Sequence, residues 1–376
     1  MAGGALDGVL VADFSRVLAG PLATMMLADL GADVIKVERP GTGDETRTWS
    51  PPVTADGDAT YFLAANRNKR SVTLDLSTVE GQESARALAG RADVLVENFA
   101  PGTMERFGLG YARLHAEYPR LVYASVSGFG RGAGADLPGY DFLVQAVGGL
   151  MSVTGQPDGE PTKVGVAVVD VLAGQHLATG ILAALLARER TGRGQRVDVS
   201  LLGSAVAGLI NQASGYLNAG VLPGRLGNAH PSIAPYQTLP TADRPIALAV
   251  GNDRQFARLA AVVGGLDAAD PRFATNPQRV RNAAALTSVL AGRLATRPAA
   301  YWVAELTAAG VPCGVVNSID EAFALAERLG LAPVVSLAGT KTVASPIALS
   351  ETPVSYRRPP PRLGQHDAEV ADRLRR

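Results

Sequence analysis

The chain has 376 residues, 47% of them apolar, and its 35 basic and 35 acidic side chains leave no formal net charge. Single hydrophobic cores usually stop growing below this length, so we expect two domains. A neutral chain has no overall field that attracts nucleic acid or an anionic membrane, and neither is an expected partner.

Cysteine and histidine are scarce in the chain. The single cysteine, Cys313, cannot form an internal disulfide and fits a reducing cytoplasm, and the N-terminus lacks the basic start and apolar run of a signal peptide. The four histidines form no metal-binding motif, and the chain has neither a phosphate loop nor a nucleophile elbow. We therefore expect a cytoplasmic protein without a metal.

Through the first two hundred residues, short β-branched runs alternate with helical stretches. This alternation predicts a parallel α/β sheet, in which ligands bind where strands end and helices begin. Turn or capping residues followed by apolar positions at helical spacing predict helices at 20–30 and 103–117. The expected strands are 8–14, 32–38, 71–76, 92–99, 121–129 and 196–201.

The apolar stretch 164–187 is long enough to resemble a membrane span. Asp170, Gln175 and His176 interrupt it, however, and such side chains are rare in the hydrocarbon region of a bilayer. We therefore interpret the stretch as a helix that is buried in the protein.

The composition changes near residue 218, where Gly and Pro become frequent and indicate an extended linker. Strands are expected beyond it at 245–250 and 314–316, with helices at 253–263 and 283–294. The predicted organisation is a large α/β domain, a linker, a small α/β domain and a C-terminal segment that returns to the large domain. Their ranges are 1–215, 216–235, 236–330 and 331–376.

Two motifs are candidates for chemistry. The first, GFGRGA at 128–133, follows an expected strand and has the spacing of a dinucleotide fingerprint, which makes a nicotinamide-dependent dehydrogenase one alternative. The residues after it contain Gly and Pro where the fingerprint requires a helix to begin. A flexible glycine loop is therefore the favoured interpretation.

The second motif is VGVAVVDVLAG, in which Asp170 follows an apolar run. A buried carboxylate costs several kcal/mol unless it is paired or hydrogen-bonded, so its presence needs a reason. Asp170 precedes a long expected helix, and a capping role there is the more common explanation for a single aspartate. A functional carboxylate is the alternative.

An ordered series of motifs decides between these alternatives, because together the motifs resemble a family III CoA-transferase. This family includes formyl-CoA transferase and the α-methylacyl-CoA racemases. The matching segments of the first lobe are DFSRVLAGP at 13–21, DLGADVIKVERPGTGDETR at 29–47, NKRSVTLDL at 68–76, ADVLVENFAPG at 92–102, SVSGFG at 125–130, GYD at 139–141, VVDVLAG at 168–174 and TGRGQRVDVSL at 191–201.

The resemblance implies a fold and an assembly. The large domain is expected to be Rossmann-like and to bind CoA, the small domain to be α/β, and two subunits to form a homodimer of interlocked rings. It also implies an acyl-CoA donor and a carboxylic acid acceptor as substrates, with no cofactor beyond CoA itself.

The resemblance further implies that Asp170 is the nucleophile of an acyl-CoA:carboxylate CoA-transferase. Its carboxylate attacks the thioester to form an aspartyl anhydride, and CoA then forms an enzyme-bound thioester. Tyr140 is expected to be a neighbouring hydrogen-bond donor, and the backbone at Gly128 and Gly130 to help stabilise the oxyanion.

Further site residues follow from the same match. Arg39 and Arg106 are expected near the phosphates of CoA, since an arginine fork suits phosphate oxygens. We also predict that Arg47 holds a second carboxylate of a small dicarboxylic acceptor. The other residues expected to line the CoA groove are Arg16, Val17, Leu18, Ala19, Leu74, Asn98 and Phe99.

Departures from the family pattern separate the remaining alternatives. Leu18 stands where formyl-CoA transferase has glutamine, which argues against oxalate and formyl-CoA as substrates. The racemases have histidine where this chain has Tyr140, and a tyrosine with a pKa near 10 is a poor base at neutral pH. Transfer is therefore preferred to racemisation, and a non-catalytic acyl-CoA binder is a further alternative.

Overall fold

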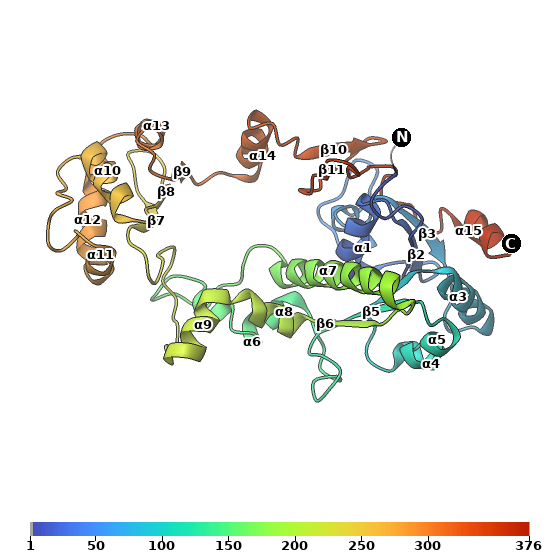
Figure 1. Cartoon of the computed structure of the whole chain (residues 1–376). Helices are drawn as coiled ribbons and strands as arrows, with labels where there is room; N and C mark the ends of the chain where they lie inside the picture. Colours follow the sequence, from blue (N-terminus) through green and yellow to red (C-terminus); the bar gives the residue numbers. More distant parts are fainter. Residues whose placement is uncertain (1–2, 376) are drawn as a thin grey trace. The chain divides into compact units, whose positions relative to one another are not determined.

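The structure is a computed structural model that describes residues 3–375, and its chain forms two compact units (Figure 1). The first unit contains residues 3–150, 164–221 and 331–375, and the second contains 151–163 and 222–330. The segment 151–163 lies with the second unit, a feature that the division expected from the sequence does not contain.

The first unit is built on a six-stranded sheet with the order β3-β2-β1-β4-β5-β6. All five strand pairs are parallel, which confirms the predicted parallel α/β sheet. The order is that of open doubly wound sheets, whose ligands bind at the carboxyl ends of the strands. The strands are β1 (Leu10–Asp13), β2 (Asp33–Glu38), β3 (Lys69–Thr73), β4 (Val94–Glu97), β5 (Val122–Ser127) and β6 (Arg196–Ser200).

Successive strand residues enter separate cores on the two faces of the sheet. In β1, Val11 packs with α1 (Ala19–Asp29) and α7 (Val168–Thr191), whereas Leu10 and Ala12 pack on the other face. This alternation follows from the two-residue period of a strand. The helices of the second face are α3 (Val79–Arg91), the short α4 (Thr103–Arg106), α5 (Tyr111–Glu117) and α15 (Asp367–Arg375).

Helix α7 contains most of the apolar stretch 164–187, from Val168 onward. It is the one helix of the described chain that is long and apolar enough to cross a membrane by length and composition, and half of its apolar window is buried. Ala173, Leu177 and Ile181 recur at helical spacing and pack in the core with α1 and the sheet. Gly192, with a φ of 69°, ends the helix in the left-handed conformation that favours glycine.

The helix predicted over 103–117 is wrong in one respect, because the structure divides it into two. Helix α4 covers Thr103–Arg106, and α5 begins at Tyr111. Gly108 lies between them with a φ of +70°, a conformation that a continuing helix does not contain.

The C-terminal segment lies on the first unit. The backbone N–H groups of Arg357 and Arg358 donate to Asn68 Oδ1, and the Asn68 N–H donates to the carbonyl of Arg358. Ser355 adds a bond from its N–H to the carbonyl of Asp29. This segment also contains the antiparallel pair β10 (Val334–Leu337) and β11 (Thr340–Val343).

The second unit contains a three-stranded antiparallel sheet that packs with helices around its own core. Its strands β7 (Tyr236–Leu239), β8 (Ile246–Ala249) and β9 (Cys313–Val315) pair in that order. The predicted helices at 253–263 and 283–294 are confirmed as α10 (Asp253–Val263) and α12 (Ala283–Leu294). The other helices of the second unit are α11 (Asn276–Arg281), α13 (Ala299–Ala308) and α14 (Ile319–Arg328).

Candidate active site

A cavity of about 440 Å³ lies in the first unit, at the carboxyl ends of the parallel strands. We call it the Asp170 cavity, because Asp170 lines it from the first turn of α7. The structure brings nine of the predicted site residues together around it. These are Arg16, Val17, Leu18, Ala19, Asn98, Phe99, Gly128, Tyr140 and Asp170.

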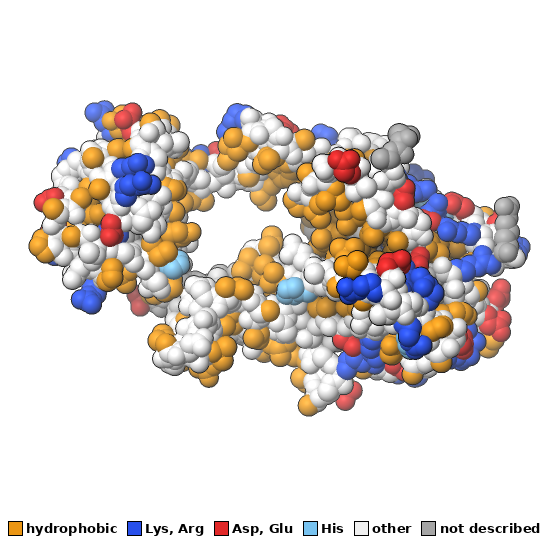
Figure 2. All heavy atoms as spheres, viewed as in Figure 1, with side chains coloured by type: hydrophobic (Ala, Val, Ile, Leu, Met, Phe, Trp, Pro, Cys, Tyr) orange, Lys and Arg blue, Asp and Glu red, His pale blue; other side chains and the backbone are white. Residues whose placement is uncertain are grey.

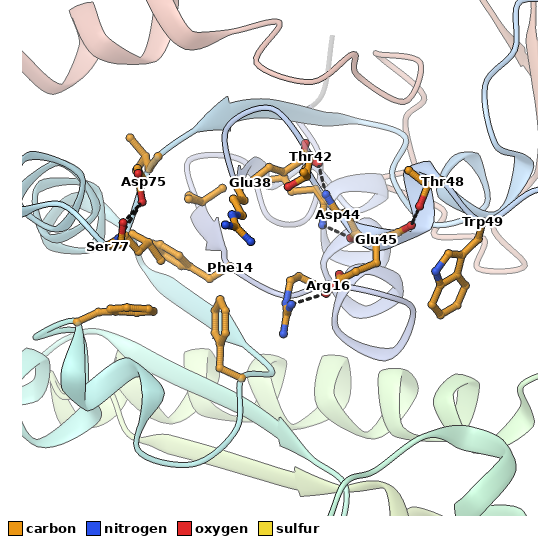
Figure 3. Close-up of a pocket in the computed structure, with 18 residues that line it drawn as sticks. Phe14, Arg16, Glu38, Thr42, Asp44, Glu45, Thr48, Trp49, Asp75 and Ser77 are labelled. Atoms are coloured by element: carbon orange, nitrogen blue, oxygen red, sulfur yellow. Dashed lines mark hydrogen bonds and ion pairs between the residues drawn. The ribbon is translucent and has the colours of Figure 1, made fainter.

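A second cavity of about 690 Å³ adjoins the first, and we call it the Arg39 cavity. Arg39 and Leu74 line it, as predicted residues of the same groove. The two cavities share Arg16, Glu45 and Phe99, so they lie next to one another along the strand ends. Figure 3 shows the Arg39 cavity, where Arg16 and Glu45 point toward one another as an ion pair.

Three predicted site residues lie outside the linings of both cavities. Arg106 is exposed, and its Nη2 donates to Thr103 Oγ1 over 3.0 Å. The N–H of Gly130 donates to Ser127 Oγ over 3.1 Å, so it already has an acceptor. Arg47, the third, has an internal partner.

The guanidinium of Arg47 forms a two-pronged ion pair with Glu38. Nε and Nη2 of Arg47 lie 2.7 Å from Oε2 and Oε1 of Glu38, respectively. The same guanidinium lies 3.7 Å from the centre of the Phe62 ring, and Nη2 also donates to the carbonyl of Pro361. The fork that the sequence assigns to a substrate carboxylate is therefore occupied by a protein carboxylate.

Asp170 lies at the amino end of α7, but it does not cap the helix. The cap position is Ala167, and the carboxylate of Asp141 instead accepts the N–H groups of Val169 (2.8 Å) and Asp170 (3.3 Å). No residue within 3–375 donates a hydrogen bond to the carboxylate of Asp170, although Asp170 is only 9% exposed. The capping explanation for Asp170 is therefore wrong, since another aspartate has that role.

Burial, and then the negative charge of Asp141, raise the pKa of Asp170 to about 7. Both effects disfavour the ionised form of a carboxyl group. A carboxyl group with such a pKa, facing a cavity and without a bonding partner, is typical of a functional site. As the pH rises through neutrality, the Asp170 carboxyl group loses its proton and becomes a carboxylate, which is the nucleophilic form.

Asp141 is a site residue that the reasoning from single residues misses. It begins α6 (Asp141–Val147), and its Oδ2 accepts a bond from Gln145 Nε2 over 2.6 Å. Gln145 Oε1 in turn accepts the N–H of Val164. This chain of bonds fixes the approach to α7, and the one available signal for it is the GYD motif.

The glycines of the GFG and GYD motifs meet in space. A Cβ on Gly128 would lie 2.6 Å from the Cα of Gly139, closer than real Cβ contacts allow. Two side-chain-free residues are needed because the backbones touch there. The contact places Tyr140 and Asp141 beside the end of β5. Between the two glycines the chain forms no helix, so the dinucleotide fingerprint lacks its required element.

Asn98 holds the loop that begins at Arg16. Its side-chain Oδ1 accepts the N–H of Arg16 (2.9 Å), and its Nδ2 donates to the carbonyl of Arg16 (2.7 Å). The next residue, Val17, has a φ of 70°, an uncommon conformation for a β-branched residue that is often found at functional sites. Asn98 therefore positions the loop over the cavity.

The buried charges of Lys36 and Asp44 bind the backbone of this loop. The sequence gives no local signal for these contacts. Lys36 Nζ lies 2.9 Å from Asp44 Oδ2 and donates to the carbonyl of Ser15 over 2.8 Å. Burial alone raises the pKa of Asp44, but the charge and hydrogen bond of Lys36 and the bonds from Thr46 lower it to about 2. Asp44 Oδ1 also accepts the N–H of Val17 at 3.3 Å.

Two tyrosines belong to the surroundings of Asp170. Tyr140, the expected hydrogen-bond donor, is 61% exposed and lines the cavity. Tyr61 is half-buried, and its burial and the charges of Asp170 and Asp141 raise its pKa. The raised pKa keeps the Tyr61 phenol protonated near neutral pH, so this group can donate a hydrogen bond but is a poor base.

Comparisons with known proteins bear on this arrangement. The family model described as CoA-transferase family III matches residues 6–367. The chain is 45% identical to the succinate–glutarate CoA-transferase of Agrobacterium fabrum, over 98% of this chain and 95% of that protein. It is 40% identical to the acetyl-CoA:oxalate CoA-transferase of Acetobacter aceti, with the same two coverages.

A solved structure is similar over the whole chain. The crystal structure of a CAIB/BAIF family protein from Brucella suis superposes with a TM-score of 0.90 at 44% identity, and it covers 99% of this chain and 100% of that one. The mixed α/β architecture is thus shared with an experimental structure.

Proposed function

From the premise that the chain belongs to CoA-transferase family III, we propose that Asp170 is the residue through which it moves CoA from an acyl-CoA to a small carboxylic acid. The observation that carries the proposal is the unpartnered carboxylate of Asp170, which faces a cavity while Asp141 caps the helix. Membership in the family makes the chain an enzyme of CoA transfer.

The proposed reaction proceeds by four exchanges at acyl carbons. The carboxylate of Asp170 attacks the thioester carbonyl, a C–O bond forms, the C–S bond breaks, and CoA leaves as a thiolate. The thiolate attacks the Asp170 carbonyl of the anhydride and releases the donor acid. The acceptor carboxylate then displaces the thiolate to form a second anhydride, and the thiolate attacks its acceptor carbonyl. Asp170 is regenerated as a carboxylate, so atoms and charge balance.

The groove supports the binding of CoA along the strand ends. We assign the nucleotide end to the Arg39 cavity, where the Arg39 guanidinium is exposed and has no ion-pair or hydrogen-bond partner within residues 3–375. A free guanidinium fork suits phosphate oxygens. The thioester end belongs to the Asp170 cavity, and Arg16, Glu45 and Phe99 lie where the two meet.

The acceptor is proposed to be a small dicarboxylic acid. The two relatives described above are named for glutarate, succinate and oxalate, which are all diacids. Arg16 is the one basic side chain among the described residues that line the Asp170 cavity. Arg47 lines neither cavity and is bound to Glu38 through two nitrogens, whereas Arg16 lines the Asp170 cavity and pairs with Glu45 through one nitrogen in an exposed pair. Arg16 is therefore the better-placed partner for a second carboxylate. Oxalate stays in the set to be tested, although Leu18 argues against it.

Racemisation is the second candidate within the family. It requires a second acid or base that exchanges the proton on the opposite face of the α-carbon. The described lining of the Asp170 cavity contains no histidine, and the raised pKa of Tyr61 makes that phenol a still weaker base. These observations favour transfer.

Trapping the acylated enzyme tests the proposal. The protein is incubated with an acyl-CoA and treated with hydroxylamine or borohydride, and the peptide containing Asp170 is analysed by mass spectrometry. Modification of that peptide, together with new acyl-CoA formed from a panel of mono- and dicarboxylic acids, is the expected result. An unmodified peptide during active turnover contradicts it, and loss of α-deuterium without transfer indicates a racemase.

A further inference from the structure

A third cavity lies at the other edge of the six-stranded sheet. It has a volume of about 460 Å³ and is lined by Leu10, Asp33 and Arg70, which stand at or next to the amino ends of β1, β2 and β3. It shares no lining residue with the Asp170 or Arg39 cavity. We call it the Arg358 cavity. It is therefore a separate site from the proposed groove for CoA.

Four arginines line the Arg358 cavity, and three of them have partners. Arg70 pairs with Asp33 and with Glu369, and Arg373 reaches the other oxygen of Asp33 at 2.6 Å. Arg357 donates to the carbonyls of Ala28, Gly31 and Ala32, at the carboxyl end of α1. Arg357 thus satisfies its donors without neutralising its charge. Figure 2 shows Lys and Arg side chains gathered around the position of α15.

The fourth arginine, Arg358, has no such partner. Its guanidinium makes no hydrogen bond or ion pair with any residue from 3 to 375, although its backbone is fixed on both sides by Asn68. Burial, and then the charges of Arg70 and Arg357, lower its pKa against the opposing charges of Asp33 and Glu369. A guanidinium that is held in place, half-buried among like charges and without an acceptor is set up to bind an anion.

The charges in the cavity favour a compact, highly charged anion. Arg357 and Arg358 are not paired with carboxylates, and the one lining carboxylate without an arginine partner is Asp7. The cavity therefore keeps an excess of positive charge. A phosphoryl group brings a charge of about −1.5 to −2 at pH 7 and oxygens that match a guanidinium fork.

We propose that the Arg358 cavity is a binding site for a phosphoryl group, with Arg358 as its main contact and Arg357 as a supporting charge. The ligand is inorganic phosphate or a small phosphate ester. Binding fixes the C-terminal segment against β3, because Arg358 and Asn68 join the two. The anion therefore stabilises the folded chain.

The test is a titration of the full chain with inorganic phosphate and with glycerol phosphate, at constant ionic strength set by chloride. Binding is measured by calorimetry and by the melting temperature. We expect saturable binding and a rising melting temperature in the wild type. A stronger effect of glycerol phosphate identifies an ester as the ligand class, and a stronger effect of phosphate identifies the free ion. Both support the site.

Three variants locate the binding. Arg358→Gln is expected to weaken it about tenfold or more, since a charge-assisted bond is lost. Asp7→Asn is expected to tighten it several-fold by removing a negative charge from the lining. Arg39→Gln is the control for phosphate that binds in the proposed CoA groove, and the binding that Arg358→Gln weakens should persist in it. If Arg358→Gln does not fold, Arg358→Lys replaces it and is expected to weaken binding while keeping the charge.

Several results overturn the proposal. They are the absence of saturable binding, equal phosphate affinity in the wild type and Arg358→Gln, a loss of affinity in Arg39→Gln alone, and a succinate affinity that falls as much as the phosphate affinity in Arg358→Gln. In the absence of phosphate, Arg358→Gln should retain the wild-type rate of CoA transfer, because Arg358 lies outside both active-site cavities.

Discussion

Asp141 Oδ1 accepts the backbone N–H of Asp170 at 3.3 Å. Asp141 therefore caps helix α7, and Asp170 is the one of the two that lines the cavity. The two carboxylates have separate tasks. The carboxylate of Asp141 accepts N–H groups at the start of α7 and adds a negative charge. The carboxylate of Asp170 faces the cavity and has a raised pKa.

The first prediction concerns the nucleophile. Asp170→Asn should lower CoA transfer by several orders of magnitude, on the scale of other lost nucleophiles, because an amide is nearly the same shape but hardly nucleophilic. The helix cap at Asp141 stays intact, so folding and CoA affinity should be retained. Steady-state kinetics measures the rate of CoA transfer, and calorimetry measures the affinity for CoA. Near-normal transfer by Asp170→Asn contradicts the mechanism.

The second prediction is a pH dependence of stability. The pKa of Asp170 is raised from 3.8 to about 7 in the folded state, so the stability that this group contributes is complete below pH 3.8 and is lost as the pH rises through 7. Asp170→Asn should therefore be more stable than the wild type at pH 8, by on the order of 2–4 kcal/mol, and about equally stable at pH 4. Denaturant unfolding at both pH values checks this. An equal difference at both is evidence against the raised pKa.

The third prediction concerns Asp141. Asp141→Asn removes the charge that helps to raise the pKa of Asp170, while Asn caps a helix about as well as Asp. The rise of the transfer rate with pH should therefore move to lower pH, by up to about one unit. Asp141→Ala is the comparison variant, and it should also lower stability because the cap is lost. An unshifted profile in Asp141→Asn shows that burial alone sets the pKa.

The fourth prediction separates the two arginines proposed for the acceptor. Arg16→Gln should raise the KM for dicarboxylic acids about tenfold and leave monocarboxylic acids unaffected, because one charge-assisted bond is lost. Arg47→Lys breaks the two-pronged pair with Glu38, so it should lower the free energy of unfolding by about 1–3 kcal/mol.

The acceptor panel measured with both variants decides the assignment. If only Arg47→Lys loses activity toward dicarboxylic acids, Arg47 is the contact for the second carboxylate, as the sequence predicts. An equal effect on mono- and dicarboxylic acids in both variants excludes either arginine as the contact for the second carboxylate.

The fifth prediction concerns assembly. Helix α9 (Ile210–Ala219) leaves large apolar side chains exposed: Ile210 at 72%, Tyr216 at 56% and Leu217 at 76%. Clustered apolar exposure of this kind is typical of an interface. A homodimer is therefore expected, and sedimentation at submicromolar concentration should show two chains. A folded and active monomer contradicts the interlocked assembly.

Much of the architecture is predictable because it depends on local patterns. The parallel strands and α7, α10 and α12 follow from hydrophobic period and length. The break between α4 and α5 is missed because it depends on the positive φ of Gly108, which the spacing of apolar residues does not reveal.

The candidate site is only partly predictable from the sequence. Arg16 and Asn98 are found through a motif. The pairing of Arg47 with Glu38 is not, because both residues lie in the segment 29–47 and the side chain of either could bind a ligand. The capping of α7 by Asp141 is likewise missed, because it joins residues about thirty positions apart and depends on tertiary packing.

The backbone contact between Gly128 and Gly139 has a consequence for how this enzyme can diversify. It ties the two ends of a surface loop, part of which, from Ala135 to Pro138, lines the Asp170 cavity. The loop is thus anchored at its two ends, and the residues between them can change while Tyr140 and Asp141 keep their positions. The shape of the Asp170 cavity can therefore vary at 135–138 without moving the residues that follow Gly139.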